Sequence, residues 1–202
     1  MSTNIEIKAR LQNATVAHGI ATQLSEAEPE LIRQRDVFFA TSNGRLKLRI
    51  LESDRAELIS YRRSNISAVR RSDYQIVTSR CPIDFLNDLT GTHSVIGVVT
   101  KLRWLYRVGQ TRIHIDCVRG LGDFLEFEVV MRPNQREVEG HAAVNELLQL
   151  FGVKSEELMG DAYVDLLNKI DDKPDWQIEL LETLDDLLFC RHGNSPIFSN
   201  GA

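Results

Sequence analysis

Residues 4–11 read NIEIKARL, in which polar and apolar side chains alternate without a break. Successive side chains of a β-strand point to opposite faces, so this period of two predicts a strand. One face of the strand would carry Asn4, Glu6, Lys8 and Arg10, and the other face would be apolar. The polar face is largely ionic, which is unusual for a strand that only borders water.

The same alternation recurs along the chain, most clearly in RLKLRIL at 45–51. Turn signals such as the Ser-Asn-Gly sequence before that segment separate the apolar runs. We therefore predict eight strands, at 4–11, 31–40, 45–51, 57–63, 72–78, 98–108, 111–118 and 123–131. Helical periodicity predicts helices at 14–27, 82–90, 139–151, 155–170 and 176–189.

The charges on the strand faces are sorted by sign in chain order. Acids lie on the first and last strands and mainly bases lie between: Glu6 and Lys8, then Arg45, Lys47 and Arg49, then Lys101 and Arg103, then Arg112, His114 and Asp116, and finally Glu126 and Glu128. Solvated faces with surface ion pairs would explain each segment alone, but not this order. A closed barrel with the ionic faces inside explains it, because closure can make the first and last strands neighbours. The sequence therefore predicts an α+β fold, a closed eight-stranded antiparallel β-barrel with helices packed outside.

The composition is that of an ordinary globular protein, with 202 residues, a net charge of −5 and 43% hydrophobic residues. We expect one domain over 1–170, followed by a helical extension and frayed tail over 171–202. No apolar run approaches the ~20 residues of a membrane helix, and no secretory signal is visible. Three widely spaced cysteines favour a reducing, cytoplasmic setting over a disulfide scaffold. The acidic net charge argues against nucleic-acid binding.

A barrel interior lined by these residues would need a charged ligand, because uncompensated like charges are costly where water is scarce. Clustered carboxylates favour a hard cation, Mg²⁺ or Mn²⁺, over zinc. A dense lining of Arg and Lys favours a polyanion, since phosphate oxygens fit the guanidinium fork. Acids at one end and bases at the other suit a metal-bound polyphosphate, so we expect phosphoryl chemistry.

In order and spacing, these segments resemble the CYTH domain family, also called triphosphate tunnel metalloenzymes. The likeness is greatest to the bacterial class IV adenylate cyclase branch. The family's ExExK strand is matched by NIEIK at 4–8. Further matches are GRLKLR at 44–49, LISYRR at 58–63, VTKLR at 99–103, RIHID at 112–116, GDFLEFE at 122–128 and AYVDLL at 162–167.

The resemblance implies a tunnel that binds a small-molecule triphosphate, such as tripolyphosphate or ATP, and a homodimer. It implies that Mg²⁺ or Mn²⁺ is held by Glu6, Asp116, Glu126 and Glu128. It implies that the triphosphate is held by Lys8, Arg45, Lys47, Arg49, Arg63, Lys101, Arg103 and Arg112. The groups expected to act in catalysis, including transfer of the nucleophile's proton, are Lys8, Glu6 and Glu128.

The sequence departs from the family motif at Asn4, where ExExK has its first Glu. An amide oxygen can still coordinate a hard cation, but it brings no charge. Three functions therefore stay open. The first is a metal-dependent triphosphatase, the second is an adenylate cyclase that makes cyclic AMP and pyrophosphate, and the third is a non-catalytic polyphosphate- or nucleotide-binding module. Hydrolysis needs only the tunnel and a water molecule, so it is the first choice.

Overall fold

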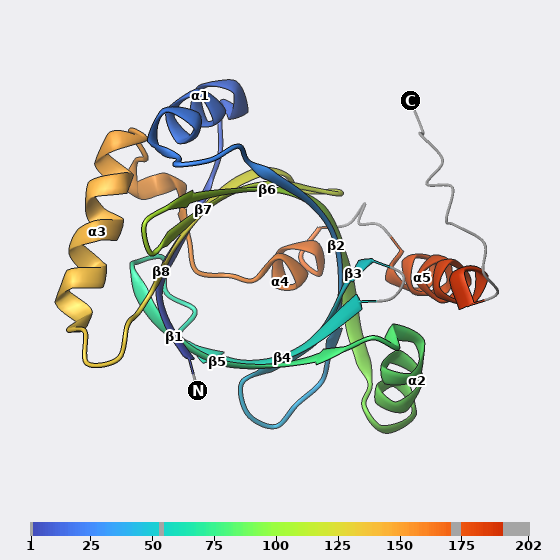
Figure 1. Ribbon diagram of the computed structural model, residues 1–202. Coiled ribbons are helices and arrows are strands. Elements are labelled where there is room, and N and C mark those ends of the chain that lie inside the picture. The colour runs from blue at the N-terminus through green and yellow to red at the C-terminus, as the bar shows by residue number, and fades with distance from the viewer. Residues whose placement is uncertain (1, 53–54, 171–174, 192–202) are drawn as a thin grey trace.

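The computed structural model describes residues 2–52, 55–170 and 175–191, and its centre is a closed antiparallel β-barrel (Figure 1). The strands in chain order are β1 Ser2–Arg10, β2 Glu30–Phe39, β3 Arg45–Glu52, β4 Arg55–Arg63, β5 Arg70–Ser79, β6 Val95–Val108, β7 Thr111–Val118 and β8 Gly122–Val130. Their hydrogen-bonded order is β5-β4-β3-β2-β6-β7-β8-β1, and β1 also pairs with β5 to close the ring. The predicted eight-stranded barrel is confirmed.

Strand β1 is the closing strand, because it pairs with the last strand β8 on one side and with β5 on the other. In the β1–β8 pairing Glu6 lies opposite Glu128, and Lys8 lies opposite Glu126. In the β1–β5 pairing Glu6 lies opposite Arg70. The first and last strands are therefore neighbours, as the order of charges predicted.

Four helices lie against the outer wall of the barrel: α1 Ala14–Leu24, α2 Pro82–Thr92, α3 Glu137–Leu150 and α5 Trp176–Arg191. Figure 1 shows α1 and α3 on one side of the ring and α2 and α5 on the other. They cover the apolar faces of the strands, where fully buried side chains such as Ile7, Phe127, Leu48 and Leu86 form the core. The inverted arrangement, apolar outside and ionic inside, is what makes the outer helices necessary.

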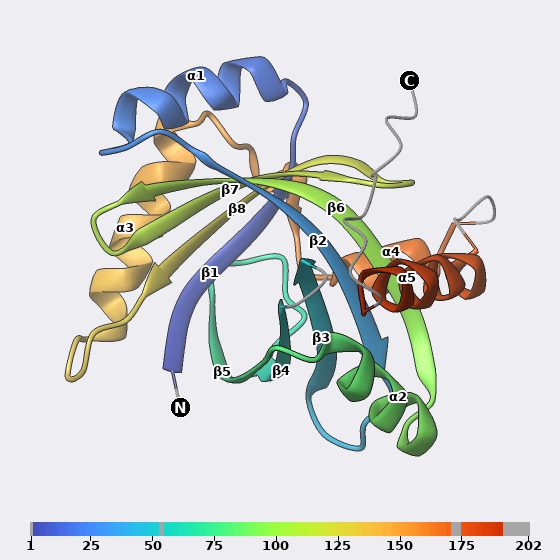
Figure 2. The same ribbon diagram turned by 45° about the vertical axis from the view of Figure 1, so that its right-hand side comes forward.

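The segment 155–170 differs from the prediction of short helices outside the barrel. It forms a 3₁₀ turn Ser155–Glu157, a short strand β9 Leu158–Met159 that extends the sheet at β1, and the helix α4 Tyr163–Leu167. Helix α4 lies at one end of the barrel beside the start of β6. Figure 1, which looks along the barrel, shows it inside the outline of the ring, and Figure 2 shows it next to β6. The close approach requires glycine at Gly97, where an added Cβ would lie 2.7 Å from a methyl carbon of Val164.

Within the described part of the chain, no helix is both long and apolar enough to cross a membrane.

Candidate active site in the barrel interior

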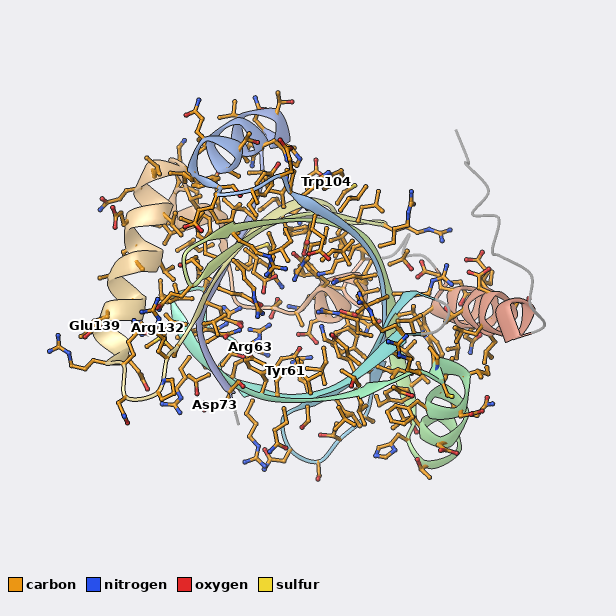
Figure 3. All side chains as sticks on the ribbon, viewed as in Figure 1. Tyr61, Arg63, Asp73, Trp104, Arg132 and Glu139 are labelled. Carbon is orange, nitrogen blue, oxygen red and sulfur yellow. The ribbon has the colours of Figure 1, made fainter. Side chains whose placement is uncertain are left out.

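The barrel encloses a cavity of about 370 Å³, within the size range of small-molecule sites. Strand alternation turns the ionic faces toward this cavity, so nine Lys or Arg and six Asp or Glu are among the described residues that line it. Figure 3 shows Tyr61 and Arg63 of β4 pointing into the barrel, whereas Trp104 of β6 lies on its outer side near α1. The excess of cations gives the lining a net positive charge.

One wall of the cavity is acidic and is formed by β1, β7 and β8. A ring nitrogen of His114 and one carboxylate oxygen each of Glu126 and Glu128 lie within 4.8 Å of one another. Glu6 is close by in the strand register, but its Oε1 lies 3.4 Å from Nε of Arg63 and 3.3 Å from Nε of Arg70. Glu6 is therefore already paired with two cations.

The carboxyl groups of Glu126 and Glu128 have opposite electrostatic surroundings. Burial raises the pKa of Glu128 to about 7, and the nearby charges of Glu126 and Glu6 reinforce the shift. Burial also opposes ionisation of Glu126, but Arg103 and Lys8 outweigh it and hold its pKa well below the usual range. The two adjacent carboxyl groups therefore carry one negative charge already in acid, and they take on a second negative charge only near neutral pH.

His114 and Lys8 are also affected by this environment. Burial, aided by the charge of Arg103, holds the pKa of His114 well below 6.5, so its ring is neutral. Burial lowers the pKa of Lys8 to about 8, although Glu126 partly offsets the effect. The acidic wall therefore holds three groups, Glu128, His114 and Lys8, whose pKa values are shifted by burial toward the neutral form.

The basic wall consists of two clusters, in each of which two cations share one buried aspartate. The Asp36 cluster lies on β2 and β3, across the ring from β1 and β8. The Asp116 cluster lies on β6 and β7 and adjoins the acidic wall, where Arg103 also donates a hydrogen bond to Glu126 at 2.9 Å. Asp36 accepts hydrogen bonds from Lys47 Nζ at 2.7 Å and from Arg49 Nε at 2.9 Å. In the second cluster, Asp116 accepts hydrogen bonds from Lys101 Nζ at 2.8 Å and from Arg103 Nε at 2.6 Å. Since each aspartate neutralises only one of its two cations, the wall keeps a positive excess.

The first turn of α4 closes one end of the cavity. Tyr163 donates a hydrogen bond from its hydroxyl to Asp116 at 3.0 Å, and Nζ of Lys8 lies 3.8 Å from the centre of its ring. The other end reaches solvent, where Glu30, Arg55 and Arg107 are exposed and line the opening. A ligand would therefore enter from the end away from α4.

Most of the residues proposed from the sequence line this cavity. They are Glu6, Lys8, Lys47, Arg49, Arg63, Lys101, Arg103, Arg112, Glu126 and Glu128. Asp116 lies behind the lining with no exposed surface, and its oxygens accept hydrogen bonds from Lys101, Arg103 and Tyr163. Arg45 is not in the lining and forms a two-pronged ion pair with Asp165 of α4, at 2.6 and 3.0 Å.

Three contributors were not identified from the sequence. Arg70 holds Glu6, but the strand prediction began two residues too late, at residue 72. Its signal was present, because Arg70 continues the inward alternation of Ser72 and Tyr74. No role in the site was predicted for Tyr163. Strand alternation places His114 on an inward ionic face with Arg112 and Asp116, but it does not show that the His114 ring meets Glu126 and Glu128.

The CYTH domain model matches residues 2–163. The chain belongs to the CYTH family. No curated protein sequence matches it. Among solved structures, the PH1012 protein of Pyrococcus horikoshii is 22% identical with a TM-score of 0.72, and the match covers 82% of this chain and 99% of that one. A candidate adenylate cyclase of Vibrio parahaemolyticus is 20% identical with a TM-score of 0.67, over 82% of this chain and 97% of that one.

A third similar structure is a candidate adenylyl cyclase of Hippeastrum that has a dominant triphosphatase activity. It is 14% identical with a TM-score of 0.54, and the match covers 80% of this chain and 91% of that one. At these identities the likenesses show the shared fold.

CYTH proteins bind triphosphates and depend on a metal ion. The acidic wall of this CYTH protein has a donor set that fits a divalent cation, since Glu126 and Glu128 offer carboxylate oxygens and His114 offers a nitrogen. All four predicted metal ligands have a cation beside them, namely Arg70 for Glu6, Lys101 for Asp116, Arg103 for Glu126 and Arg112 for Glu128.

Proposed function

We propose that this CYTH protein hydrolyses a triphosphate in its tunnel with the help of Mg²⁺ or Mn²⁺. One observation carries the proposal. The three buried side-chain polar atoms without a hydrogen-bond partner, among the described residues, belong to Asn4, Gln34 and His114, and all three residues line the cavity. Unpaired buried polar atoms are costly, so their concentration here favours a polar ligand that completes the site.

The basic wall supplies the binding step. Asp36 neutralises only one of the two positive charges of Lys47 and Arg49, so phosphate oxygens would bind to this pair of cations. Lys101 and Arg103 would bind phosphate oxygens in the same way beside Asp116. Because the aspartates hold these side chains before a ligand arrives, little side-chain entropy is lost on binding. Positioning of this kind is the main requirement of phosphoryl transfer.

The acidic wall supplies the reacting end. Glu126 and Glu128 would hold the metal ion, which polarises phosphoryl oxygens and offsets their charge. Glu6 orients Arg63 and Arg70 toward the same region. Lys8, with a pKa near 8, is the group placed to exchange a proton with the attacking water or the leaving phosphate.

An apolar band near the open end favours an organic triphosphate over an inorganic one. Its members line the cavity together with the charged groups and are Ile32, Leu51, Ile59, Ile76 and Leu105. Such a band could accept a base or sugar, and this keeps adenylate cyclisation of ATP as the second candidate. The dominant triphosphatase activity of the Hippeastrum protein of the same fold is in line with hydrolysis as the first.

The test is to incubate the purified protein with tripolyphosphate, ATP or thiamine triphosphate, with Mg²⁺ or Mn²⁺, and to analyse the products. We expect orthophosphate from at least one substrate. Cyclic AMP with pyrophosphate would establish the cyclase instead. Thermal stabilisation by the triphosphates without turnover would establish a binding module.

A further inference from the structure

The side chain of His114 is placed as a metal ligand would be. Its residue lies on β7, opposite Glu126 in the strand pairing, and only 3% of its surface is exposed. Its Nδ1 has no hydrogen-bond partner in the part of the chain that the structure describes. A buried imidazole nitrogen without a partner is energetically unfavourable, so the position favours a residue whose lone pair is used by something that binds there.

Two carboxylates share the position with this ring. One oxygen of Glu126, one oxygen of Glu128 and a ring nitrogen of His114 lie within 4.8 Å of one another. Each carboxylate has one cation near it: Arg103 donates to Oε2 of Glu126 at 2.9 Å, and Arg112 lies 3.7 Å from Oε2 of Glu128. Glu6 is the more fully occupied acid, since its Oε1 lies within 3.4 Å of two cations, Arg63 and Arg70. The most complete donor set therefore has two oxygens and one nitrogen.

A nitrogen in the donor set changes which ion the site prefers. Mg²⁺ binds through oxygen ligands and keeps much of its water shell. An imidazole nitrogen is a softer donor than a carboxylate oxygen and favours first-row transition-metal ions, with Mn²⁺ the weakest binder of that series and the one that also accepts carboxylate oxygens. A purely carboxylate site would discriminate much less.

We propose that His114 ligates the tunnel metal together with Glu126 and Glu128, so that the site selects a transition-metal ion such as Mn²⁺ over Mg²⁺. This inference rests on the proposed function, because the same ion serves the triphosphate. It adds a nitrogen ligand and a metal preference that the carboxylates alone do not imply.

The test uses the full chain loaded with Mn²⁺ in the absence of any triphosphate. Pulsed electron paramagnetic resonance should detect a ¹⁴N nucleus bound directly to Mn²⁺. The signal should change when the protein is labelled with ¹⁵N-histidine. It should disappear in His114→Asn and persist in His141→Asn, a matched control on the outer helix α3. Titration with each metal should show that His114→Asn weakens Mn²⁺ binding by more than about tenfold, the least that losing even an outer-shell partner costs, and changes Mg²⁺ binding little.

The results separate this inference from the proposed function. Bound Mn²⁺ without a histidine nitrogen signal in the wild type would overturn the inference even if triphosphate is hydrolysed. Equal Mn²⁺ affinity in wild type and His114→Asn would overturn it as well. A histidine nitrogen signal in a protein that turns over no triphosphate would support the ligand and overturn the hydrolase. The wild-type labelling experiment needs no variant to fold.

Discussion

The two walls of the tunnel differ in how completely the protein neutralises its own charges. On the basic wall Asp36 and Asp116 lie between paired cations at 2.6–2.9 Å, and both are buried. On the acidic wall Glu126 accepts a hydrogen bond from Arg103 at 2.9 Å, but the nearest described cation to Glu128, Arg112, is 3.7 Å away, and Nδ1 of His114 has no partner among the described residues. The basic wall is ordered before any ligand binds, whereas the acidic wall is left incomplete.

This difference indicates a division of roles. Ion pairs within the basic wall hold long side chains in one geometry, which favours preorganised binding, and loss of one partner would leave a buried charge uncompensated. The acidic wall instead keeps a carboxyl group and an imidazole in surroundings that favour their neutral forms. Such groups lower the stability of the metal-free protein, and a bound cation would stabilise them more than it would stabilise groups that are already paired. Changes in the two walls should therefore affect stability and activity in opposite ways.

The largest expected effect is loss of turnover in Glu128→Gln. The amide has almost the same shape but no negative charge, so the metal and the developing phosphoryl charge lose a partner. We expect turnover to fall by at least about 100-fold, the scale of removing one transition-state-stabilising group. Steady-state kinetics with the best triphosphate measure it, and Glu139→Gln on α3 is the control. Activity within a few-fold of wild type would remove Glu128 from the site.

The next effect belongs to the basic wall. Asp36→Asn leaves Lys47 and Arg49 without their shared carboxylate, and breaking a buried pair costs about 3–5 kcal/mol. The free energy of unfolding should therefore fall by about 3 kcal/mol in denaturant titrations at pH 7. The exposed Asp88→Asn on α2 should change it by less than about 0.5 kcal/mol. Equal stability of the two variants would show that the pairs are not stabilising.

The same variant has a defined dependence on pH. Although burial opposes ionisation, Arg49 and Lys47 hold the pKa of Asp36 well below its ordinary value of 3.8. A lowered pKa gives stability that is fully present above 3.8 and is lost as the pH falls below it. The stability difference between wild type and Asp36→Asn should therefore shrink in acid. A difference that stays constant from pH 7 to pH 2.5 would contradict this assignment.

The acidic wall should show the reverse trend, with a smaller effect. Burial raises the pKa of Glu128 from 4.5 to about 7, so ionising it in the folded protein is unfavourable. In metal-free protein, this group should reduce stability progressively as the pH rises from about 4.5 to about 7. Glu128→Gln cannot ionise, so it should be more stable than wild type at pH 8 and similar to it at pH 4. Thermal unfolding with a chelator present measures both, and a less stable variant at pH 8 would refute the prediction.

The contrast between the walls also shows what the sequence could predict. Period-two alternation identified the strands, and the sorting of charges by sign predicted that β1 and β8 meet and that the ionic faces point inward. Which cations share an acid was not predictable, because Asp36 meets Arg49 through the register of β2 with β3. The two-residue strand β9 and the short helix α4 are too short to show a period. The sequence therefore did not predict the hydrogen bond from Tyr163 of α4 to Asp116, nor the ion pair between Arg45 and Asp165 of α4.

The smallest expected effect concerns Arg45, which the sequence assigned to the triphosphate. Its guanidinium is paired with Asp165 at the α4 end, outside the cavity lining, whereas Arg49 lines the cavity. Arg45 could bind the triphosphate only after its ion pair with Asp165 has opened, and the free energy lost on opening would offset much of the free energy gained on binding. We expect Arg45→Ala to raise KM by about twofold and Arg49→Ala to raise it by about tenfold, the latter corresponding to roughly 1.4 kcal/mol. Equal increases in KM would place Arg45 on the bound substrate and would show that α4 moves when the triphosphate enters, because Asp165 would then have to release it.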